Sequence, residues 1–397
     1  MKILLVHNSG SRHLSSGEMR VVENEKRALQ QRGIDVYLHV VYNDAFDSRN
    51  PFKLLKTGLN FFYSLMGREL LAKLLKQFQP DLVHFHSILP LLTPSVFHLC
   101  HQKNIPVLQT LHNFRWLCVE GGLYRDGHIC RQCLNRYGWP GAWHGCAKNS
   151  RFISLLLFSI NALYRRSGYL YRWVDKFIAV SEFVRDAYVQ AGFPSEKIVL
   201  KYNGVTMPTQ IEKPETKQGI TFVGRLTKSK GTEILGQLFD RVKYPFNIIG
   251  SGPEEEKLKT ICRQNNFNHV RFWGNLPSME TFEIIATSAC VIIPSQCGET
   301  FSLVAGEALS QGTPIIVSAF GGPMELVEES GGGIIVDPQD INGFGDAIEK
   351  IMNSPILADR MGNAGQNFFQ QNLSIKNTTD QLIKIYEQVI ENKIKTD

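Results

Sequence analysis

The chain has 397 residues, of which 43% are hydrophobic and 20% charged, a composition typical of a globular protein with room for two domains. Its longest strongly apolar stretch covers only residues 153–164, far short of the ~20 residues that a membrane-spanning helix needs. A strand-like segment begins at Ile3 and leaves no room for a signal peptide, so we expect a cytoplasmic protein.

The net charge of +6 is unevenly distributed along the chain. Residues 1–200 hold 25 Lys and Arg against 14 Asp and Glu, whereas residues 201–397 hold 18 against 23. The first half is therefore predicted to face an anionic partner, with a solvated basic face as the common alternative. A membrane surface fits better than nucleic acid, because no nucleic-acid recognition module is visible.

Short apolar strands alternate with amphipathic helical segments along the whole chain, which is typical of parallel sheets buried on both faces. In the first half we predict strands at Lys2–His7, Val36–Val40, Leu82–His86, Val107–Leu111 and Lys176–Val180. In the second half we predict strands at Ile220–Val223, Phe246–Ile249, Val270–Trp273, Val291–Pro294, Pro314–Val317 and Gly333–Val336.

The alternation restarts after residue 203, where a polar segment at 207–218 is typical of a linker. We therefore predict an α/β protein with two doubly wound, Rossmann-like domains, residues 1–203 and 204–373, that face a cleft. The tail, residues 374–397, is one helical pattern with no strand after it. Such a helix has to pack on something, and we expect it to cross back to the first domain.

Two glutamates lie eight positions apart in the segment GETFSLVAGEAL, residues 298–309. Glu299 follows an apolar strand and a turn, and is expected at the carboxyl end of a parallel sheet, where such sheets bind ligands. The next helix is predicted to begin at Phe301. Glu307 falls one to two turns into it, where a carboxylate can accept two hydrogen bonds from a ribose diol. A solvated helix charge is the alternative for each. Backbone N–H groups that would attract an anion there belong to Phe301, Ser302 and Leu303.

A basic loop, GRLTKSKG at residues 224–231, follows the first strand of the second domain and supplies Arg225, Lys228 and Lys230. Cations beside a helix start suit a diphosphate. The chain has no Asp-x-Asp pair of the kind that chelates a metal-bound nucleotide sugar. We therefore expect no catalytic metal, because the loop cations would neutralise the diphosphate.

The order of the motifs GRLTKSKG, GSGPEEEKL, GNLPSMETFEIIATSACVIIPS and GETFSLVAGEALSQGTPIIVSAFGGPMELV resembles glycosyltransferase family 4, whose members are retaining enzymes of the GT-B fold. The resemblance covers nearly the whole chain. It includes SSGEMRVVENEKRALQQRGIDV, which is similar to the family's glycine loop and first helix, with Ser16 where a second glycine is usual.

This resemblance implies roles for individual residues. Glu299 is implied to contact the hydroxyls of the donor sugar, and Glu307 to hold the nucleotide ribose. The phosphate-binding pair would be Arg225 and Lys230. From the first domain, Gly17 would approach the diphosphate, and His112 would lie near the transferred sugar. A turn at Gly321 and Gly322 would be structural.

A 29-residue segment, 118–146, shows no strand pattern and is predicted to lack strands. It holds four of the eight cysteines: Cys118, Cys130, Cys133 and Cys146. Such a cluster resembles a structural zinc site, and a subset of family 4 has similar spacing. Four unligated thiols and a redox-labile disulfide remain alternatives, and His128 and His144 are candidate substitute ligands.

An apolar segment with basic and aromatic flanks, residues 148–173, predicts either an ordinary core helix or an interfacial helix that docks on anionic lipid. In the second case the basic side chains expected to face the lipid are Arg151, Arg165, Arg166 and Arg172, and the aromatic side chains expected to insert are Phe158, Tyr169 and Trp173. We expect a cytoplasmic protein that is peripheral at the inner face of the membrane.

The predicted function is retaining transfer of a sugar from a nucleoside diphosphate to a glycan or lipid-linked acceptor in cell-surface polysaccharide synthesis. The alternatives are a small-sugar phosphorylase or synthase of the same fold, and an inactive subunit that binds sugar nucleotides. Release of a nucleoside diphosphate would separate the transferase from both.

Overall fold

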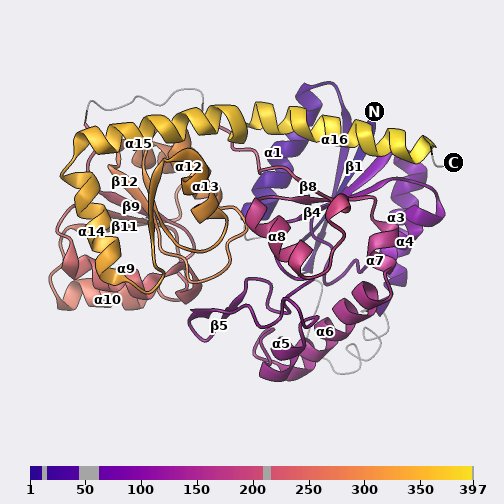
Figure 1. The fold of residues 1–397 in the computed structure, drawn as a ribbon, viewed down its shortest axis with the longest axis horizontal. Helices are drawn as coiled ribbons and strands as arrows, with labels where there is room; N and C mark the ends of the chain where they lie inside the picture. Colours follow the sequence, from indigo (N-terminus) through magenta and orange to yellow (C-terminus); the bar gives the residue numbers. More distant parts are fainter. Residues whose placement is uncertain (11–15, 44–61, 209–215, 396–397) are drawn as a thin grey trace. The chain divides into compact units, whose positions relative to one another are not determined.

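A computed structural model describes residues 1–10, 16–43, 62–208 and 216–395, and most of the predicted linker lies outside these ranges. The chain forms two compact units. Unit 1 comprises residues 1–121, 131–204 and 375–397, and unit 2 comprises residues 122–130 and 205–374. Each unit is built on one parallel six-stranded sheet with helices on its faces (Figure 1). The two doubly wound, Rossmann-like folds predicted from the alternation of strands and helices are therefore confirmed.

The sheet of unit 1 has the strand order β2-β1-β3-β4-β7-β8, and every neighbouring pair is parallel. Its strands are β1 (Lys2–Ser9), β2 (Asp35–Tyr42), β3 (Leu82–Phe85), β4 (Val107–Leu111), β7 (Lys176–Ala179) and β8 (Ile198–Leu200). Its helices are α1 (Gly17–Gln31), α3 (Leu65–Phe78), α4 (Ser95–Gln102), α5 (Trp139–His144), α6 (Arg151–Arg166), α7 (Tyr169–Trp173), α8 (Glu182–Gln190) and α16 (Ile375–Lys395), with a 3₁₀ turn at Ser195–Lys197.

The sheet of unit 2 is also parallel, but its topology differs, with the order β11-β10-β9-β12-β13-β14. Its first strand, β9, lies beside its fourth, β12, whereas in unit 1 the first strand, β1, lies beside the third, β3. The strands of unit 2 are β9 (Ile220–Val223), β10 (Phe246–Ile249), β11 (Val270–Gly274), β12 (Cys290–Ile293), β13 (Ile315–Ser318) and β14 (Gly333–Val336). Its helices are α9 (Thr232–Arg241), α10 (Glu255–Gln264), α11 (Ser278–Thr287), α12 (Leu303–Ser310), α13 (Gly322–Ser330), α14 (Ile341–Met352) and α15 (Pro355–Phe368), with a 3₁₀ turn at Lys228–Lys230 and a π-helical turn at Phe369–Leu373.

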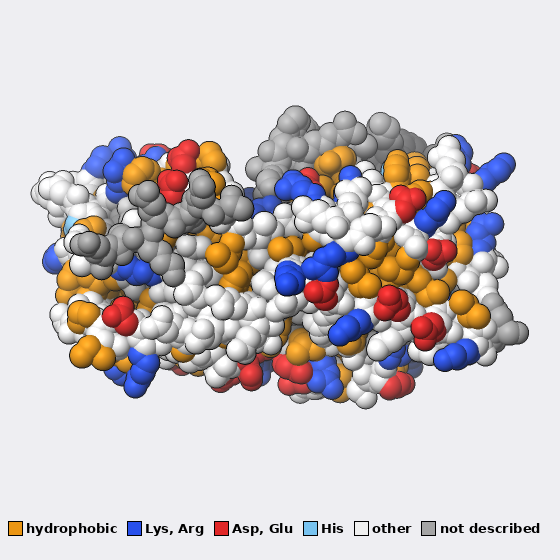
Figure 2. All heavy atoms as spheres, turned by 90° about the horizontal axis from the view of Figure 1, so that it is seen from above, with side chains coloured by type: hydrophobic (Ala, Val, Ile, Leu, Met, Phe, Trp, Pro, Cys, Tyr) orange, Lys and Arg blue, Asp and Glu red, His pale blue; other side chains and the backbone are white. Residues whose placement is uncertain are grey.

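The C-terminal helix α16 completes the core of unit 1, as the sequence predicts (Figure 1). Its apolar stripe recurs every three or four residues, which puts Leu382, Ile385, Tyr386 and Val389 on one buried face. These side chains pack into the same hydrophobic cluster as residues of β1 and β3. The solvent side of the molecule along which α16 runs carries both signs of charge, interspersed (Figure 2).

The cysteine-containing segment differs from the prediction that it lacks strands. It contains a two-stranded antiparallel hairpin, β5 (Tyr124–Arg125) with β6 (His128–Ile129), as well as α5. Asp126 and Gly127 form the hairpin turn, both with positive φ, which is the geometry that an Asp-Gly pair favours. This hairpin groups with unit 2 rather than with the first domain: the N–H of Gly298 donates to the carbonyl of Gly122 at 2.7 Å.

Candidate active site

In unit 2, Glu299 lies in the loop after β12 and is paired with a lysine. Its side chain is 9% exposed, and its Oε1 atom lies 2.8 Å from the ammonium nitrogen of Lys230. The hydroxyl of Ser295 donates to the same oxygen. Burial alone would raise the pKa of Glu299, but Lys230 and the hydrogen bonds outweigh burial, so the net pKa is below its ordinary value. Glu299 is therefore an ionised carboxylate at the carboxyl end of the sheet.

A glycine turn holds the backbone of this loop in place. The N–H of Gly322 donates to the carbonyl of Glu299 at 2.8 Å. A β-carbon on Gly321, where φ is +97°, would lie 2.8 Å from that carbonyl oxygen, and one on Gly322 would lie 2.5 Å from the carbonyl oxygen of Thr300. Side chains at either position would push the loop away, which agrees with the structural role expected for this pair.

The basic loop after β9 meets the loop after β12 through Gly231. At its φ of +79°, a β-carbon there would lie 2.0 Å from the carbonyl oxygen of Pro294, so only glycine allows this approach. The approach brings Lys230 to Glu299. Lys228 instead pairs with Glu233 of α9 at 3.4 Å, and Arg225 is exposed. The structure therefore places Lys230, one of the two residues predicted to bind phosphate, in direct contact with Glu299, the residue predicted to bind the sugar.

Helix α12 begins at Leu303, two residues later than the sequence pattern predicts. Ser302, at φ +78°, is its N-cap, and its hydroxyl accepts from the N–H of Ala305 at 3.4 Å. Phe301 precedes the cap and is buried in the core at 2% exposure. Glu307 lies within α12 and is also only 2% exposed. The first turn of α12 thus directs N–H groups toward the loop that carries Glu299.

In unit 1, His112 directly follows β4 and is buried, with 7% of its surface exposed. Its Nε2 atom lies 2.9 Å from Nδ1 of His86, which follows β3, and the two rings stack with an interplanar angle of 14°. Burial is the main cause that lowers the pKa of His112, partly offset by the carboxylates of Glu18 and Glu25. The imidazole is therefore neutral near pH 7.

Glu18 lies beside the candidate site residue His112, and the sequence analysis missed it. Its neighbour Gly17 is the exposed first residue of α1, whose N-cap is Ser16. The carboxylate of Glu18 accepts a 2.7 Å hydrogen bond from the hydroxyl of Ser87 and a 3.0 Å hydrogen bond from the side-chain amide of Asn113. These bonds tie the start of α1 to the ends of β3 and β4, next to His112.

A small cavity of about 20 Å³ lies beside His112, enough space for one water molecule. Its walls come from the ends of β3 and β4 and from α8, and they include Arg115, Trp116 and Tyr188. Trp116 and Tyr188 are buried, and the hydroxyl of Tyr188 donates to the carbonyl of Asn113 at 2.8 Å. This hydrogen bond and the packing of the two buried aromatic side chains hold the segment that follows β4 in place.

Two of the four candidate zinc ligands are brought together. The thiol groups of Cys118 and Cys133 share a hydrogen bond, which is the main cause that lowers the pKa of Cys118 to about 7. Cys146 is half-buried in unit 1, whereas Cys130 ends the segment that groups with unit 2. A thiolate is the form that binds zinc, so the lowered pKa at Cys118 suits a ligand.

None of the helices in the described ranges is both long and apolar enough to cross a membrane. Within the segment that the sequence favours for membrane docking, Arg165 is 4% exposed and bonds the carbonyl oxygen of Trp116 at 3.1 Å. Trp173 is buried too, stacked on Tyr169. The expectation that Arg165 and Trp173 face a membrane is therefore wrong. A helix pattern shows which residues share a face, but not which basic side chain turns inward to cap carbonyl groups.

Two family profiles match the chain in succession: "Glycosyltransferase Family 4" over residues 16–207 and "Glycosyl transferases group 1" over residues 206–368. The class that this fold and site define is therefore the GT-B glycosyltransferases, and the chain belongs to glycosyltransferase family 4.

Three relatives illustrate this membership. An uncharacterized glycosyltransferase of Methanocaldococcus jannaschii is 25% identical over 215 residues, which cover 54% of this chain and 60% of that protein. The O-antigen chain mannosyltransferase C of Escherichia coli is 24% identical over 174 residues, covering 43% of this chain and 47% of that protein. The crystal structure of Anabaena HepE in complex with UDP-glucose is 18% identical, covers 98% of this chain and 100% of that chain, and superposes with a TM-score of 0.65. The chain spans about 60% of the length of the first curated relatives that it matches.

Proposed function

We propose that the chain is a retaining glycosyltransferase that moves a sugar from a nucleoside diphosphate to a glycan or lipid-linked acceptor. The observation that carries the proposal is the ionised Lys230–Glu299 pair, with its 2.8 Å contact, beside the first turn of α12. A bound diphosphate can replace Glu299 as the ion-pair partner of Lys230. The carboxylate of Glu299 can then accept hydrogen bonds from sugar hydroxyls.

The chemistry that these groups support is a front-face displacement, in which the leaving diphosphate helps to deprotonate the acceptor hydroxyl. Arg225, Lys230 and the N–H groups at the start of α12 stabilise the negative charge that develops on the diphosphate. His112 is the residue of unit 1 proposed to contact the transferred sugar. Because the cations are the protein's own, the reaction needs no divalent metal. The complex of HepE with UDP-glucose supports a nucleoside-diphosphate sugar as the donor class.

The test is release of a nucleoside diphosphate from a panel of sugar nucleotides, with EDTA present and an acceptor extract added. Release that survives EDTA supports the proposal. Strict dependence on added Mg²⁺ or Mn²⁺ contradicts the metal-independent chemistry. Release of a sugar phosphate instead identifies a phosphorylase, and binding without turnover identifies an inactive subunit.

The acceptor is proposed to lie at an anionic membrane surface, and α5 and α6 of unit 1 are the docking elements. Their exposed apolar side chains include Trp139 (47% exposed), Trp143 (65%) and Phe152 (62%). Exposed basic residues flank them: Arg131, Arg136, Lys148 and Arg151. The match to an O-antigen mannosyltransferase supports a cell-surface glycan as the product.

Co-sedimentation with vesicles tests this docking surface. Each basic residue near an anionic surface contributes about 1 kcal/mol, and salt weakens the attraction. The triple variant Arg136→Glu/Lys148→Glu/Arg151→Glu should lose binding to anionic vesicles at low salt. The matched control, Lys376→Glu/Lys384→Glu/Lys395→Glu, makes the same charge change on α16, on the opposite side of unit 1 (Figure 1), and should keep it. Equal binding to neutral vesicles would contradict the proposal.

Zinc in the cysteine segment is proposed on the chemistry of its thiols, with Cys118 and Cys133 as the pair already in contact. Elemental analysis of freshly purified, reduced protein should give about one zinc per chain. A Cys133→Ser variant should lose it. A zinc content well below one in the unsubstituted protein would contradict the proposal.

A further inference from the structure

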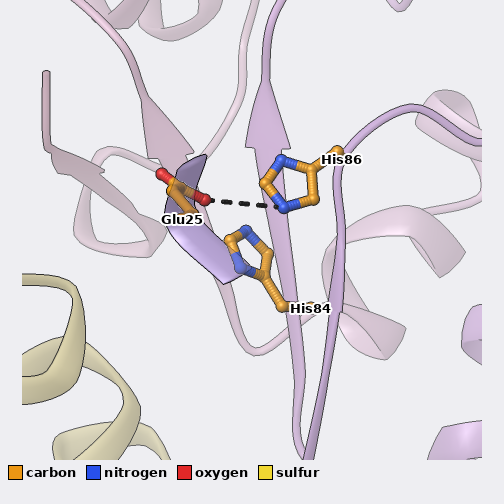
Figure 3. A group of neighbouring side chains, drawn as sticks. All are labelled: Glu25, His84 and His86. Atoms are coloured by element: carbon orange, nitrogen blue, oxygen red, sulfur yellow. Dashed lines mark ion pairs between the residues drawn. The ribbon is translucent and has the colours of Figure 1, made fainter. Parts of the chain in front are cut away.

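A line of buried ionisable side chains runs behind His112 in unit 1. The ammonium group of Lys201 is paired with Oε1 of Glu25, and both side chains are 3% exposed. The other carboxylate oxygen, Oε2, faces Nε2 of His86 at 3.6 Å, slightly beyond hydrogen-bond range (Figure 3). The line ends at the 2.9 Å contact between Nδ1 of His86 and Nε2 of His112. It joins α1, the segment after β8, and the ends of β3 and β4.

The same cluster also has the composition of a metal site. Potential ligand atoms of Glu25, His84 and His86 all lie within 4.8 Å of one another, the only such trio found in the described ranges (Figure 3). Two observations argue against a metal ion. Lys201 already supplies the positive charge at Glu25. Both ring nitrogens of His84 are engaged, Nδ1 with the Tyr386 hydroxyl at 2.8 Å and Nε2 with the Thr110 hydroxyl at 2.7 Å. The cluster is therefore a network of hydrogen bonds and one ion pair.

The charge state of each member of this line is defined by its surroundings. Burial would raise the pKa of Glu25, but the neighbouring ammonium of Lys201 outweighs it and holds the net pKa below the ordinary value. Glu25 is therefore ionised. Burial lowers the pKa of His86 far below the ordinary histidine value, and nearby His84 and His112 lower it further. With His112 neutral as well, the line contains one ammonium group, one carboxylate and two neutral imidazoles.

These charge states determine which group donates and which accepts each hydrogen bond along the line. An ionised carboxylate only accepts hydrogen bonds, and a neutral imidazole has one N–H and one accepting nitrogen. Nε2 of His86 and Oε2 of Glu25 have no other hydrogen-bond partner among the described residues, so the proton of His86 belongs on Nε2, facing the carboxylate. Nδ1 of His86 is then an acceptor, and the proton in the His86–His112 contact comes from Nε2 of His112.

We infer that Glu25 is a positioning residue, which acts through His86 to hold His112 in the tautomer with its proton on Nε2 and its lone pair on Nδ1. Only Nδ1 of His112 is then able to accept a hydrogen bond from a sugar hydroxyl. This inference rests on the proposed function for one point, the place of His112 beside the transferred sugar. The tautomer itself depends only on the contacts within unit 1.

Nitrogen NMR of the full chain with ¹⁵N-labelled histidine tests the inference without an activity assay. The resonances of His112 are assigned by their loss in a His112→Gln variant. In the unsubstituted chain they should show a protonated Nε2 and an unprotonated Nδ1. A protonated Nδ1 on neutral His112 would overturn the inference. Because the spectrum is that of the unsubstituted chain, the result does not depend on whether a variant at Glu25 folds.

The substitution Glu25→Gln should reverse the donor and acceptor roles in every hydrogen bond from residue 25 to His112. Lys201 donates to Oε1 of position 25, so the new amide N–H group would face His86 and donate to its Nε2. His86 would then carry its proton on Nδ1 and donate to Nε2 of His112, which moves the His112 proton to Nδ1. Glu25→Asp keeps a carboxylate and should keep the original tautomers. Tyr386→Phe removes a hydrogen bond of similar burial from the same network and should leave His86 and His112 unchanged. An unchanged His112 tautomer in Glu25→Gln would overturn the inference.

Kinetics separate this inference from the proposed function. With an active sugar nucleotide, Glu25→Gln should lower kcat roughly 10- to 100-fold, the scale seen when a partner that orients a functional histidine is removed. The donor KM should change less than about twofold, because the proposed nucleotide contacts belong to unit 2. A reduced donor affinity with unchanged kcat would overturn the positioning role. Absence of any sugar transfer by the unsubstituted chain would contradict the proposed function but leave the tautomer reading intact.

Discussion

The two units each contain a lysine–glutamate pair, and the pairs differ in burial. In unit 1, Lys201 and Glu25 are both 3% exposed. In unit 2, Lys230 is 32% exposed and Glu299 is 9% exposed. Both carboxylates have a pKa below the ordinary value because burial, which raises it, is outweighed by the adjacent ammonium group. The same two residue types thus form a sealed pair in one unit and a pair open to solvent in the other.

This difference in burial separates a structural ion pair from one that can exchange partners. A sealed pair keeps its partner, because either charge alone would lie in a medium that solvates it poorly. A pair with one exposed member loses little when the lysine turns to another anion, since water and the ligand both compensate it. We therefore expect substitutions in the first pair to change stability, and those in the second to change ligand affinity.

The largest expected effect comes from Lys201→Met. This substitution leaves the carboxylate of Glu25 buried without its cation and should lower the free energy of unfolding of unit 1 by about 3–5 kcal/mol. Urea denaturation of the full chain measures it. The double variant Lys201→Met/Glu25→Leu removes both charges and should recover much of the loss. A single-variant loss below about 1 kcal/mol would show that burial does not separate the two pairs.

Glu307 sharpens the comparison because it is 2% exposed, as buried as Glu25, yet it is proposed to bind the ribose. The substitution Glu307→Ala should weaken donor binding by about 2–4 kcal/mol, through two lost charge-assisted hydrogen bonds. The loss should be visible as a higher donor KM. A folded variant with unchanged donor KM would remove the ribose assignment and return Glu307 to a structural role.

Lys230→Met tests the open pair directly. It should lower the free energy of unfolding by less than about 1 kcal/mol, because the lysine is partly exposed. Donor affinity should fall by about 1.5–3 kcal/mol, through loss of a charged hydrogen bond to phosphate. Lys228→Met is the matched control: Lys228 lies in the same loop and pairs with Glu233 on the surface. Comparable affinity losses in both variants would indicate a general charge effect rather than a specific phosphate contact.

The smallest expected effect is a loss of folding stability at acidic pH. Both Glu25 and Glu299 have a folded pKa below the ordinary value of 4.5, so their contribution to stability is fully present above that value and disappears as the pH falls below it. The stability difference between the chain and each Glu→Gln variant should be constant from pH 6 to 8, and it should shrink below about pH 4.5. Added salt should reduce the difference for Glu299 more than for Glu25. A difference that changed between pH 6 and 8 would indicate another titrating group.

Local sequence patterns predicted the fold and part of the candidate site. Each strand of unit 2 was recognisable as a short apolar run, and Glu299 and Lys230 were found because each lies in a short motif directly after such a strand. Lys201, Glu25 and His86 were not found, because the fold brings together residues that are far apart in the sequence. Lys201 has no local pattern that distinguishes it from a surface lysine.

Other differences had a signal in the sequence. Asp126-Gly127 between short β-prone segments is a strong hairpin signal, but each strand that it joins is only two residues long, too short to show an alternation of polar and apolar residues. Likewise, Ser302 followed by an apolar run is a typical N-cap, which would have moved the start of α12 from residue 301 to 303. The inward turn of Arg165 had no such signal, since its partners are carbonyl groups of distant segments.

The place of α16 has a consequence for the order in which the chain is synthesised and folded. All of the residues of unit 2 leave the ribosome before α16 does, whereas the core of unit 1 lacks Leu382, Ile385, Tyr386 and Val389 until α16 has been synthesised. Domains usually fold as units in the order of their synthesis. Here the unit that is made first can complete its core only after the second unit is finished, so the nascent chain carries an open apolar surface while unit 2 is being made.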